Sequence, residues 1–167
     1  MVGKNGGRSL QCGEQWGRVA TMQRPVLVGE YEFTLDVKNR VAIPARLRHA
    51  FADGVYLTKA LEPCLSAYGP EAFEQLLDDQ LNGVSANSSK GRDLTRFTAG
   101  NAVFQELDRQ GRVTIPARHL AYAGITREVS IIGVKDHVEI WDRAAWAECL
   151  SRLEEEADAT ADELAAT

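Results

Sequence analysis

The chain has 167 residues, 44% of them hydrophobic, which is enough for one compact domain with its own core. A net charge of −5 argues against a general nucleic-acid binder, and no apolar run approaches the roughly 18 residues that a membrane-spanning helix needs. The three cysteines are odd in number and lack metal-ligand spacing, so the composition predicts a reduced cytoplasmic setting with neither a metal nor a cofactor.

Residues 1–24 are predicted to form a disordered N-terminal extension. The segment is rich in glycine and has no apolar core of about 7 to 15 residues, so it is not a signal peptide. Its basic side chains outnumber its single acid, which leaves open a role as a basic arm that contacts DNA (Lys4, Arg8, Arg18 and Arg24 against Glu14).

A strand followed by a tight hairpin is predicted next. Apolar and polar residues alternate from Tyr31 to Leu35, as in a half-buried strand, and the alternation resumes at Val41 and Ile43. Residues 36–40 therefore form the tip of a hairpin. Pro44 holds the preceding Ile43 in an extended conformation, and Pro44 itself suits the first turn of a short helix.

The same segment occurs a second time. LDVKNRVAIPAR, Leu35 to Arg46, returns as LDRQGRVTIPAR, Leu107 to Arg118, with eight of the twelve positions identical. A module used twice predicts two copies related by a pseudo-twofold axis within one barrel or sheet. We place the first repeat at 26–81 and the second at 101–150, with a linker at 82–100 that contains a short helix over 89–99.

The two predicted tips share the same turn chemistry. Asn39 and Gly111 occupy equivalent positions and are the two residue types that most readily accept a positive φ. The carboxylates of Asp36 and Asp108 can accept backbone N–H groups across such a turn or pair with the arginine four residues later. Positive charge is concentrated here, with four basic residues to one acid between Asp36 and His49 (Lys38, Arg40, Arg46 and Arg48).

The C-terminal segment 151–167 is predicted to be an acidic helical tail that is exposed to solvent. It carries one arginine against six acids, so it accounts for the whole net charge of −5 and the rest of the chain sums to zero. The overall negative charge therefore does not exclude nucleic-acid binding by the basic tips.

The doubled pattern, LxDxxGRxxIPAxxR, resembles the MraZ family, which has the swapped-hairpin barrel of AbrB-like regulators. The segment Ile131 to Trp146 is also similar, and the resemblance covers 26–150. It implies a mainly β barrel with flanking helices. It further implies a ring-forming, nucleoid-associated transcriptional repressor in the bacterial cytoplasm, which binds double-stranded DNA at direct repeats upstream of the division and cell-wall gene cluster. Asn39 departs from the glycine that the family usually has.

This resemblance implies roles for the tip residues. We expect Arg40 and Arg112 to be the primary DNA readers. The residues that orient the tips are Asp36, Asp108, Asn39 and Gly111, and the secondary DNA contacts are Lys38, Arg109, Arg46 and Arg118. From spacing alone, Arg40 and Arg112 fit equally well as structural residues that close their own turns. Arg46 and Arg118, which we place in the helices after the prolines, fit equally well as braces of the barrel.

Other functions are less well supported by the sequence. The three histidines do not fall at equivalent places in the two copies, and no nucleophile is paired with a base at a recognisable spacing. The Gly-Ser cleavage site of a related self-processing decarboxylase is absent. Two alternatives stay open: a protein-interaction module, for which the resemblance suggests a partner such as the neighbouring ribosomal RNA methyltransferase, and an AbrB-like antitoxin.

Overall fold

The computed structural model describes residues 24–83 and 88–165, so the predicted extension up to residue 23 lies outside the described residues. The first repeat contains β1 (Leu27–Thr34), β2 (Arg40–Ala42), η1 (Arg48–Phe51), β3 (Val55–Lys59), β4 (Leu65–Tyr68) and α1 (Pro70–Gly83). After it come α2 (Ser89–Asn101), β5 (Val103–Gln105), β6 (Arg112–Thr114), α3 (Ala117–Ala123), β7 (Glu128–Lys135), β8 (His137–Asp142) and α4 (Arg143–Ala165).

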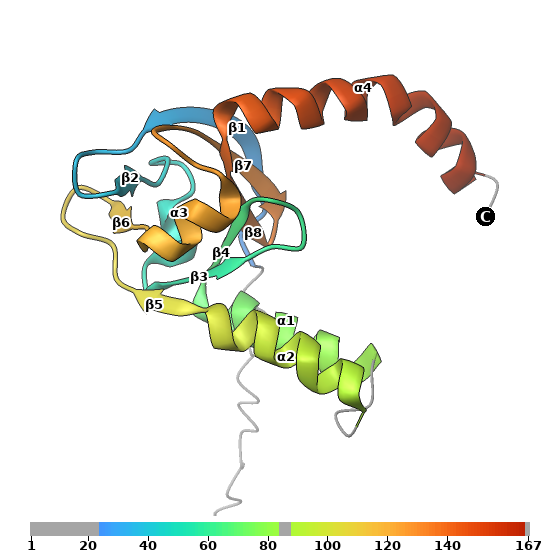
Figure 1. Ribbon diagram of the computed structural model, residues 1–167, viewed down its shortest axis with the longest axis horizontal. Coiled ribbons are helices and arrows are strands. Elements are labelled where there is room, and N and C mark those ends of the chain that lie inside the picture. The colour runs from blue at the N-terminus through green and yellow to red at the C-terminus, as the bar shows by residue number, and fades with distance from the viewer. Residues whose placement is uncertain (1–23, 84–87, 166–167) are drawn as a thin grey trace, which may run out of the picture.

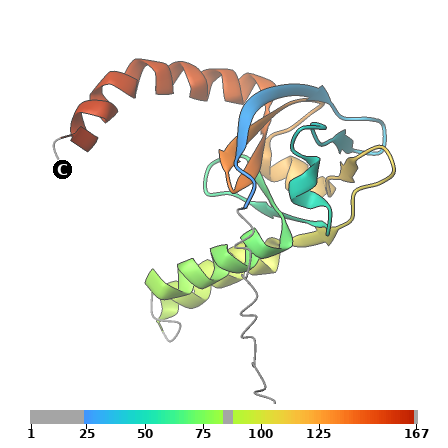
Figure 2. The ribbon, with the colours of Figure 1, turned by 180° about the vertical axis from the view of Figure 1, so that it is seen from behind.

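The strands of the two repeats interleave. The six-stranded sheet has the order β1-β7-β8-β4-β3-β5, and β2 pairs with β6 in a separate two-stranded sheet. Strand β1 of the first repeat pairs with β7, and the equivalent β5 of the second repeat pairs with β3. The pairs β4–β8 and β2–β6 join equivalent strands across the pseudo-twofold axis. The expected relation between the copies is confirmed, and every strand pairing is antiparallel (Figures 1 and 2).

One hydrophobic core lies between the two sheets. Val41 and Val113 of the two-stranded sheet belong to the same buried cluster as Leu57, Ile131 and Ile140 of the six-stranded sheet. Complete burial of such a side chain contributes about 1.5–3 kcal/mol relative to an exposed one. The cluster draws on both repeats, so this core forms only when the two repeats pack together. The expected fold, mainly β with flanking helices and built from two repeats, is confirmed.

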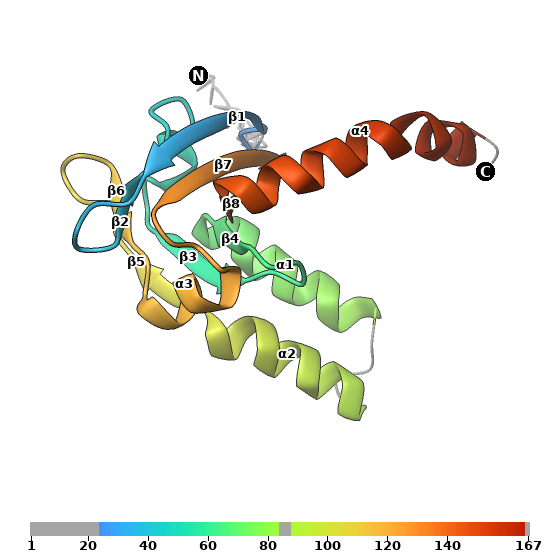
Figure 3. The same cartoon turned by 45° about the horizontal axis from the view of Figure 1, so that its top comes forward.

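Helices α1 and α2 lie side by side on one side of the barrel (Figures 1 and 3). The Phe73 ring of α1 stacks on Tyr56 of β3, with ring centroids 4.4 Å apart. The hydroxyl of Thr58 donates to the backbone oxygen of Thr98 at 2.9 Å and so ties α2 to the same strand. The helix expected between the repeats is therefore present, and it packs on the barrel. The residue limits of the repeats and the linker stay predictions.

Helix α4 extends away from the barrel (Figures 1 and 3). Trp146 near its beginning contacts Trp141 of β8, with ring centroids 5.7 Å apart, whereas residues 151–157 are all exposed. The acidic segment is thus helical up to residue 165, and its described side chains, in 151–157, are solvated as expected. Within residues 24–83 and 88–165, no helix combines the length and the apolar character needed to cross a membrane.

The segments after the two prolines differ, which corrects one expectation. In the second repeat α3 begins at Ala117 and contains Arg118, as predicted. In the first repeat residues 45–47 form a turn, and only Arg48–Phe51 is helical, as a 3-10 helix. Arg46 therefore lies in a turn and not in a helix. The backbone there forms i to i+3 hydrogen bonds, with Leu47 N–H donating to the Pro44 oxygen at 2.8 Å.

Candidate nucleic-acid interface

Each hairpin tip is closed by its own aspartate. The Asp36 Oδ1 atom accepts the backbone N–H groups of Lys38 at 2.8 Å and Arg40 at 2.9 Å, and Oδ2 accepts the Arg40 Nε–H at 2.7 Å. The second tip repeats this pattern almost atom for atom. Asp108 accepts N–H groups from Gln110 and Arg112, both at 2.9 Å, and the Arg112 Nε–H at 2.8 Å.

The residue before each arginine has the predicted positive φ, which is 58° at Asn39 and 73° at Gly111. The carbonyl groups of these two residues accept hydrogen bonds from the opposite repeat. Asn39 accepts the Ile115 N–H and Gly111 accepts the Ile43 N–H, both at 2.8 Å. Each turn is therefore fixed from inside by its aspartate and from outside by the other repeat.

The arginines have a structural contact and a free end. Their Nε atoms pair with the aspartates of their own turns. Each arginine therefore closes its own turn through its Nε atom. Arg112 also reaches across to the first tip, with Nη1 3.5 Å from Asp36 Oδ2. The two terminal nitrogens of Arg40 have no hydrogen-bond partner among the described residues. One arginine can thus both close a turn and contact a ligand.

Electrostatics favour charged aspartates at both tips. The backbone N–H of Arg40, and to a smaller extent its guanidinium group, holds the pKa of Asp36 below the usual value. The backbone N–H and guanidinium of Arg112 lower the pKa of Asp108 in the same way. The carboxylates therefore stay ionised near neutral pH and keep orienting the arginines.

The two tips lie side by side at one end of the molecule, away from α1, α2 and α4 (Figures 1 and 3). Between them, β2 and β6 form a two-stranded ribbon whose inner face carries the buried Val41 and Val113. Side chains alternate along a strand, so Arg40 and Arg112 are on the outer face of this ribbon. The structure thus brings both predicted primary residues to one surface.

The predicted secondary residues are all exposed. Their side chains form no ion pair or hydrogen bond with any described residue (Lys38, Arg46, Arg109 and Arg118). For Arg46 and Arg118, the alternative role as braces of the barrel therefore has no hydrogen bond or ion pair to support it within the described part of the chain. All four supply positive charge that no carboxylate neutralises.

Two side chains at the site had no role in the sequence-based interpretation. Gln105 of β5 holds the outer edge of β6, because its amide oxygen accepts the Thr114 N–H at 3.0 Å and its amide nitrogen donates to the Thr114 oxygen. Arg48 lies against the second tip, where its side chain occupies the space beside Gly111. The sequence shows Arg48 only as one more positive charge, because its contact with Gly111 depends on the interleaving of the repeats.

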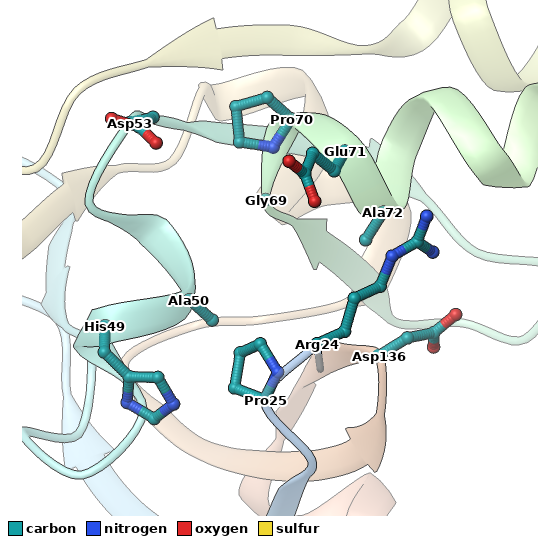
Figure 4. Close-up of a pocket in the computed structure, with 10 residues that line it drawn as sticks. All are labelled: Arg24, Pro25, His49, Ala50, Asp53, Gly69, Pro70, Glu71, Ala72 and Asp136. Atoms are coloured by element: carbon teal, nitrogen blue, oxygen red, sulfur yellow. The ribbon is translucent and has the colours of Figure 1, made fainter. Parts of the chain in front are cut away.

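A separate pocket of about 170 Å³ lies where the chain enters β1 (Figure 4). Its polar side chains come from several elements, and Figure 4 shows His49 and Asp136 on opposite sides of it. The pocket contains carboxylates, an arginine and a histidine, but it brings no serine, cysteine or threonine to the histidine. Among the described residues, no group of acidic, histidine or cysteine side chains is arranged to hold a metal ion.

The model of a protein family described as "MraZ protein, putative antitoxin-like" matches the chain twice, at residues 26–96 and 98–167. The chain belongs to the MraZ family. This confirms the resemblance that the doubled motif indicated, and the two matches agree with the two repeats of the fold.

Relatives within the MraZ family are similar over most of the chain. A protein of Kocuria rhizophila is 38% identical over 129 residues, which is 77% of this chain and 90% of that protein. Proteins of Clostridium beijerinckii and Thermoanaerobacter pseudethanolicus are 38% and 40% identical over 123 residues, or 74% of this chain and 86% and 85% of theirs. All three are named "Transcriptional regulator MraZ", a name that describes a regulator and not an enzyme.

Proposed function

We propose that this protein is a sequence-specific DNA-binding transcriptional repressor. It acts as a ring-shaped oligomer on direct repeats upstream of the division and cell-wall gene cluster. The observation that carries the proposal is the ribbon of β2 and β6, with Arg40 and Arg112 on its outer face and the exposed Lys38 and Arg109 in the two tips that adjoin it. The major groove of B-DNA, about 12 Å wide, admits a two-stranded antiparallel ribbon.

The charge distribution supports two kinds of DNA contact. The free terminal nitrogens of Arg40 suit base edges or phosphate, because guanidinium groups form paired hydrogen bonds with guanine. Lys38 and Arg109 extend from the tips without a partner among the described residues and suit phosphate groups. A single tip offers few contacts, so repeated tips on repeated DNA sites would supply the affinity.

Self-association is supported by the edge of the six-stranded sheet. Strand β1 is an edge strand; Val26 just before it and Val28 within it are 68% and 61% exposed. Val134, which pairs with Val28 on the neighbouring strand, is also exposed. Exposed edge strands with apolar side chains are usually covered by another chain or protected by charge. A second copy at this edge would extend the sheet toward a ring.

A binding assay tests the proposal. The purified protein is titrated against the DNA upstream of its own gene and against a scrambled fragment, together with Arg40→Ala and the control Arg152→Gln. Arg152 carries the same charge but lies on α4, where it pairs with Glu156. We expect at least about tenfold preference for the native fragment, in line with about 1–3 kcal/mol for each arginine contact to a base.

Arg40→Ala should lose that preference with a small change in melting temperature, since its ion pair is partly exposed to solvent. Arg152→Gln should bind like the wild type. If the wild type binds both fragments equally, or neither, the DNA proposal is wrong and a protein partner becomes the better interpretation.

A further inference from the structure

The guanidinium group of Arg48 lies at the second tip, although Arg48 is not part of either hairpin turn. Arg48 opens η1 in the first repeat, and its Nε–H donates to the backbone oxygen of Ile43 at 2.8 Å. A Cβ atom added to Gly111 would overlap the Nε, Cζ and Cδ atoms of Arg48. The guanidinium group therefore occupies the place that a side chain at position 111 would fill.

Arg48 also differs from the motif arginines in its charge balance. Asp36 and Asp108 each lie within ion-pair distance of Arg40 or Arg112 and offset their charges. Arg48 forms no ion pair with any described residue, and a backbone carbonyl is its hydrogen-bond partner. Its terminal nitrogens are left with their full positive charge beside the second tip.

The first tip has no counterpart to this group. The residue that aligns with Arg48 in the second repeat is Leu120, which is 9% exposed and belongs to the hydrophobic core. This difference also accounts for the residues at the turns. A side chain at position 111 would have to displace the end of Arg48, whereas Asn39 has its side chain at the equivalent position.

We propose that Arg48 is a further DNA-contacting residue, which binds a backbone phosphate at the second tip only and thereby gives the two tips of a protomer unequal numbers of phosphate contacts. The inference rests on the proposed DNA-binding function. Arg48 is fixed at Nε and lies against the tip backbone, and its two terminal nitrogens match a pair of phosphate oxygens. Phosphate contacts set the register and orientation of a protein on DNA but carry no direct sequence information.

The consequence is directional binding. Two equivalent tips related by a pseudo-twofold axis would fit a DNA site equally well in either orientation. An additional phosphate contact at one tip favours one of these orientations. A protomer with inequivalent tips thus suits sites that all point the same way along the DNA.

Salt-dependent binding of Arg48→Gln tests the proposal, with Arg48→Lys and Arg152→Gln measured alongside. We expect Arg48→Gln to weaken binding to native and scrambled DNA by the same factor. The slope of log affinity against log salt should fall by about 0.9 for each phosphate that the variant no longer neutralises. Arg48→Lys should keep most of the slope, and Arg152→Gln should keep both affinity and slope. Melting curves confirm that each variant is folded.

A second variant leaves Arg48 in place. Gly111→Asn keeps a residue that accepts a positive φ but fills the space of the guanidinium group. It should therefore displace Arg48 and lower the affinity and slope as Arg48→Gln does, while adding little in the Arg48→Gln background. Hydroxyl-radical footprints on one repeat should be uneven in the wild type and more even in both variants.

The outcomes separate the two proposals. If Arg40→Ala loses specific binding while Arg48→Gln keeps the wild-type affinity and slope, the role of Arg48 is wrong and the proposed function stands. If Gly111→Asn and Arg48→Gln have additive effects, Arg48 does not act at the second tip. If the wild type does not prefer its upstream DNA, the proposed function and this inference both fail.

Discussion

The tip aspartates combine two tasks in one side chain. Asp36 uses one oxygen for backbone N–H groups and the other for the Arg40 Nε–H, so it fixes the turn and the direction of the arginine together. Arg112 pairs with both Asp108 and Asp36 and so links the two turns. A substitution at either carboxylate would change the position of an arginine as well as the stability of a turn.

The turn at position 39 gives a prediction about backbone conformation. Asn39→Gly should leave the stability unchanged or slightly higher, because glycine adopts a φ of 58° without a Cβ penalty. Asn39→Val should lower the free energy of unfolding by about 1–3 kcal/mol, since a β-branched residue is strained there. Urea unfolding measures both. Lys38→Val, at the neighbouring exposed position without a positive φ, is the control and should cost less than Asn39→Val.

Turn residues of this kind could be predicted from the sequence because they act locally. Asp36, Asn39 and Arg40 lie within five positions of one another, and their spacing alone determines which groups can meet. Arg48 could not be assigned in the same way. It meets Gly111 only because β2 and β6 pair across the repeats, and nothing near Arg48 in the sequence indicates that pairing.

At the scale of elements, two histidines contact neighbouring segments, and their contributions to stability depend on pH in opposite directions. His119 of α3 is fully buried, and its Nε2 atom lies 2.8 Å from the Asn101 oxygen at the end of α2. Burial lowers the pKa of His119, with Arg118 and Lys59 adding to the effect. His137 of β8 is also subject to burial, but its neighbours Glu139 and Asp136 outweigh it, so its pKa is raised.

The signs of these shifts give a prediction. A lowered pKa means that the unfolded chain binds the proton more readily, so the contribution of His119 is present above about pH 6.5 and is lost as the pH falls. The contribution of His137 is present below that pH and is lost as the pH rises through its raised pKa. Between pH 7 and 5, His119→Gln should therefore lose less stability than the wild type, and His137→Gln should lose more.

Thermal unfolding at pH 5, 6 and 7 measures this difference. His49 is exposed, so His49→Gln is the matched control and should follow the wild-type profile. Parallel profiles for all four proteins would show that neither His119 nor His137 controls the acid sensitivity.

Some elements could be predicted from the sequence and one could not. The alternating strands and the helix between the repeats follow from local periodicity, and both are present. The helix expected after Pro44 is not, because this segment forms a turn and a short 3-10 helix. In the second repeat α3 is an α-helix that ends at Gly124 with a φ of 63°. Similar sequences thus form different local structures where their tertiary contacts differ.

For the whole molecule, charge is divided between its ends. The basic tips lie at one end, and the acidic part of α4 extends from the barrel elsewhere (Figure 3). The described side chains of the tail are exposed, so removing it should leave the core intact. The negative tail would repel DNA at long range, and salt would screen that repulsion.

Deleting residues 151–167 removes a net charge of −5 and tests this division. We expect tighter binding to scrambled DNA at low salt, a smaller effect at high salt, and an unchanged preference for the native fragment. Titrations at two salt concentrations measure the change, and the melting temperature of the shortened protein serves as the control for folding. A loss of the preference would mean that the tail takes part in specific binding.

The interleaved strands also determine when the protein can fold on the ribosome. Strand β1 pairs in register with β7, so Leu27 meets Lys135 only after about a hundred further residues have been made. At about 5–20 residues per second, that interval lasts on the order of 5 to 20 s. Until β5 and β6 have been made, the nascent first repeat has none of its partner strands from the second repeat, and β7 and β8 come later still. Folding of this barrel therefore waits until translation of both repeats is nearly complete, and it cannot proceed one repeat at a time.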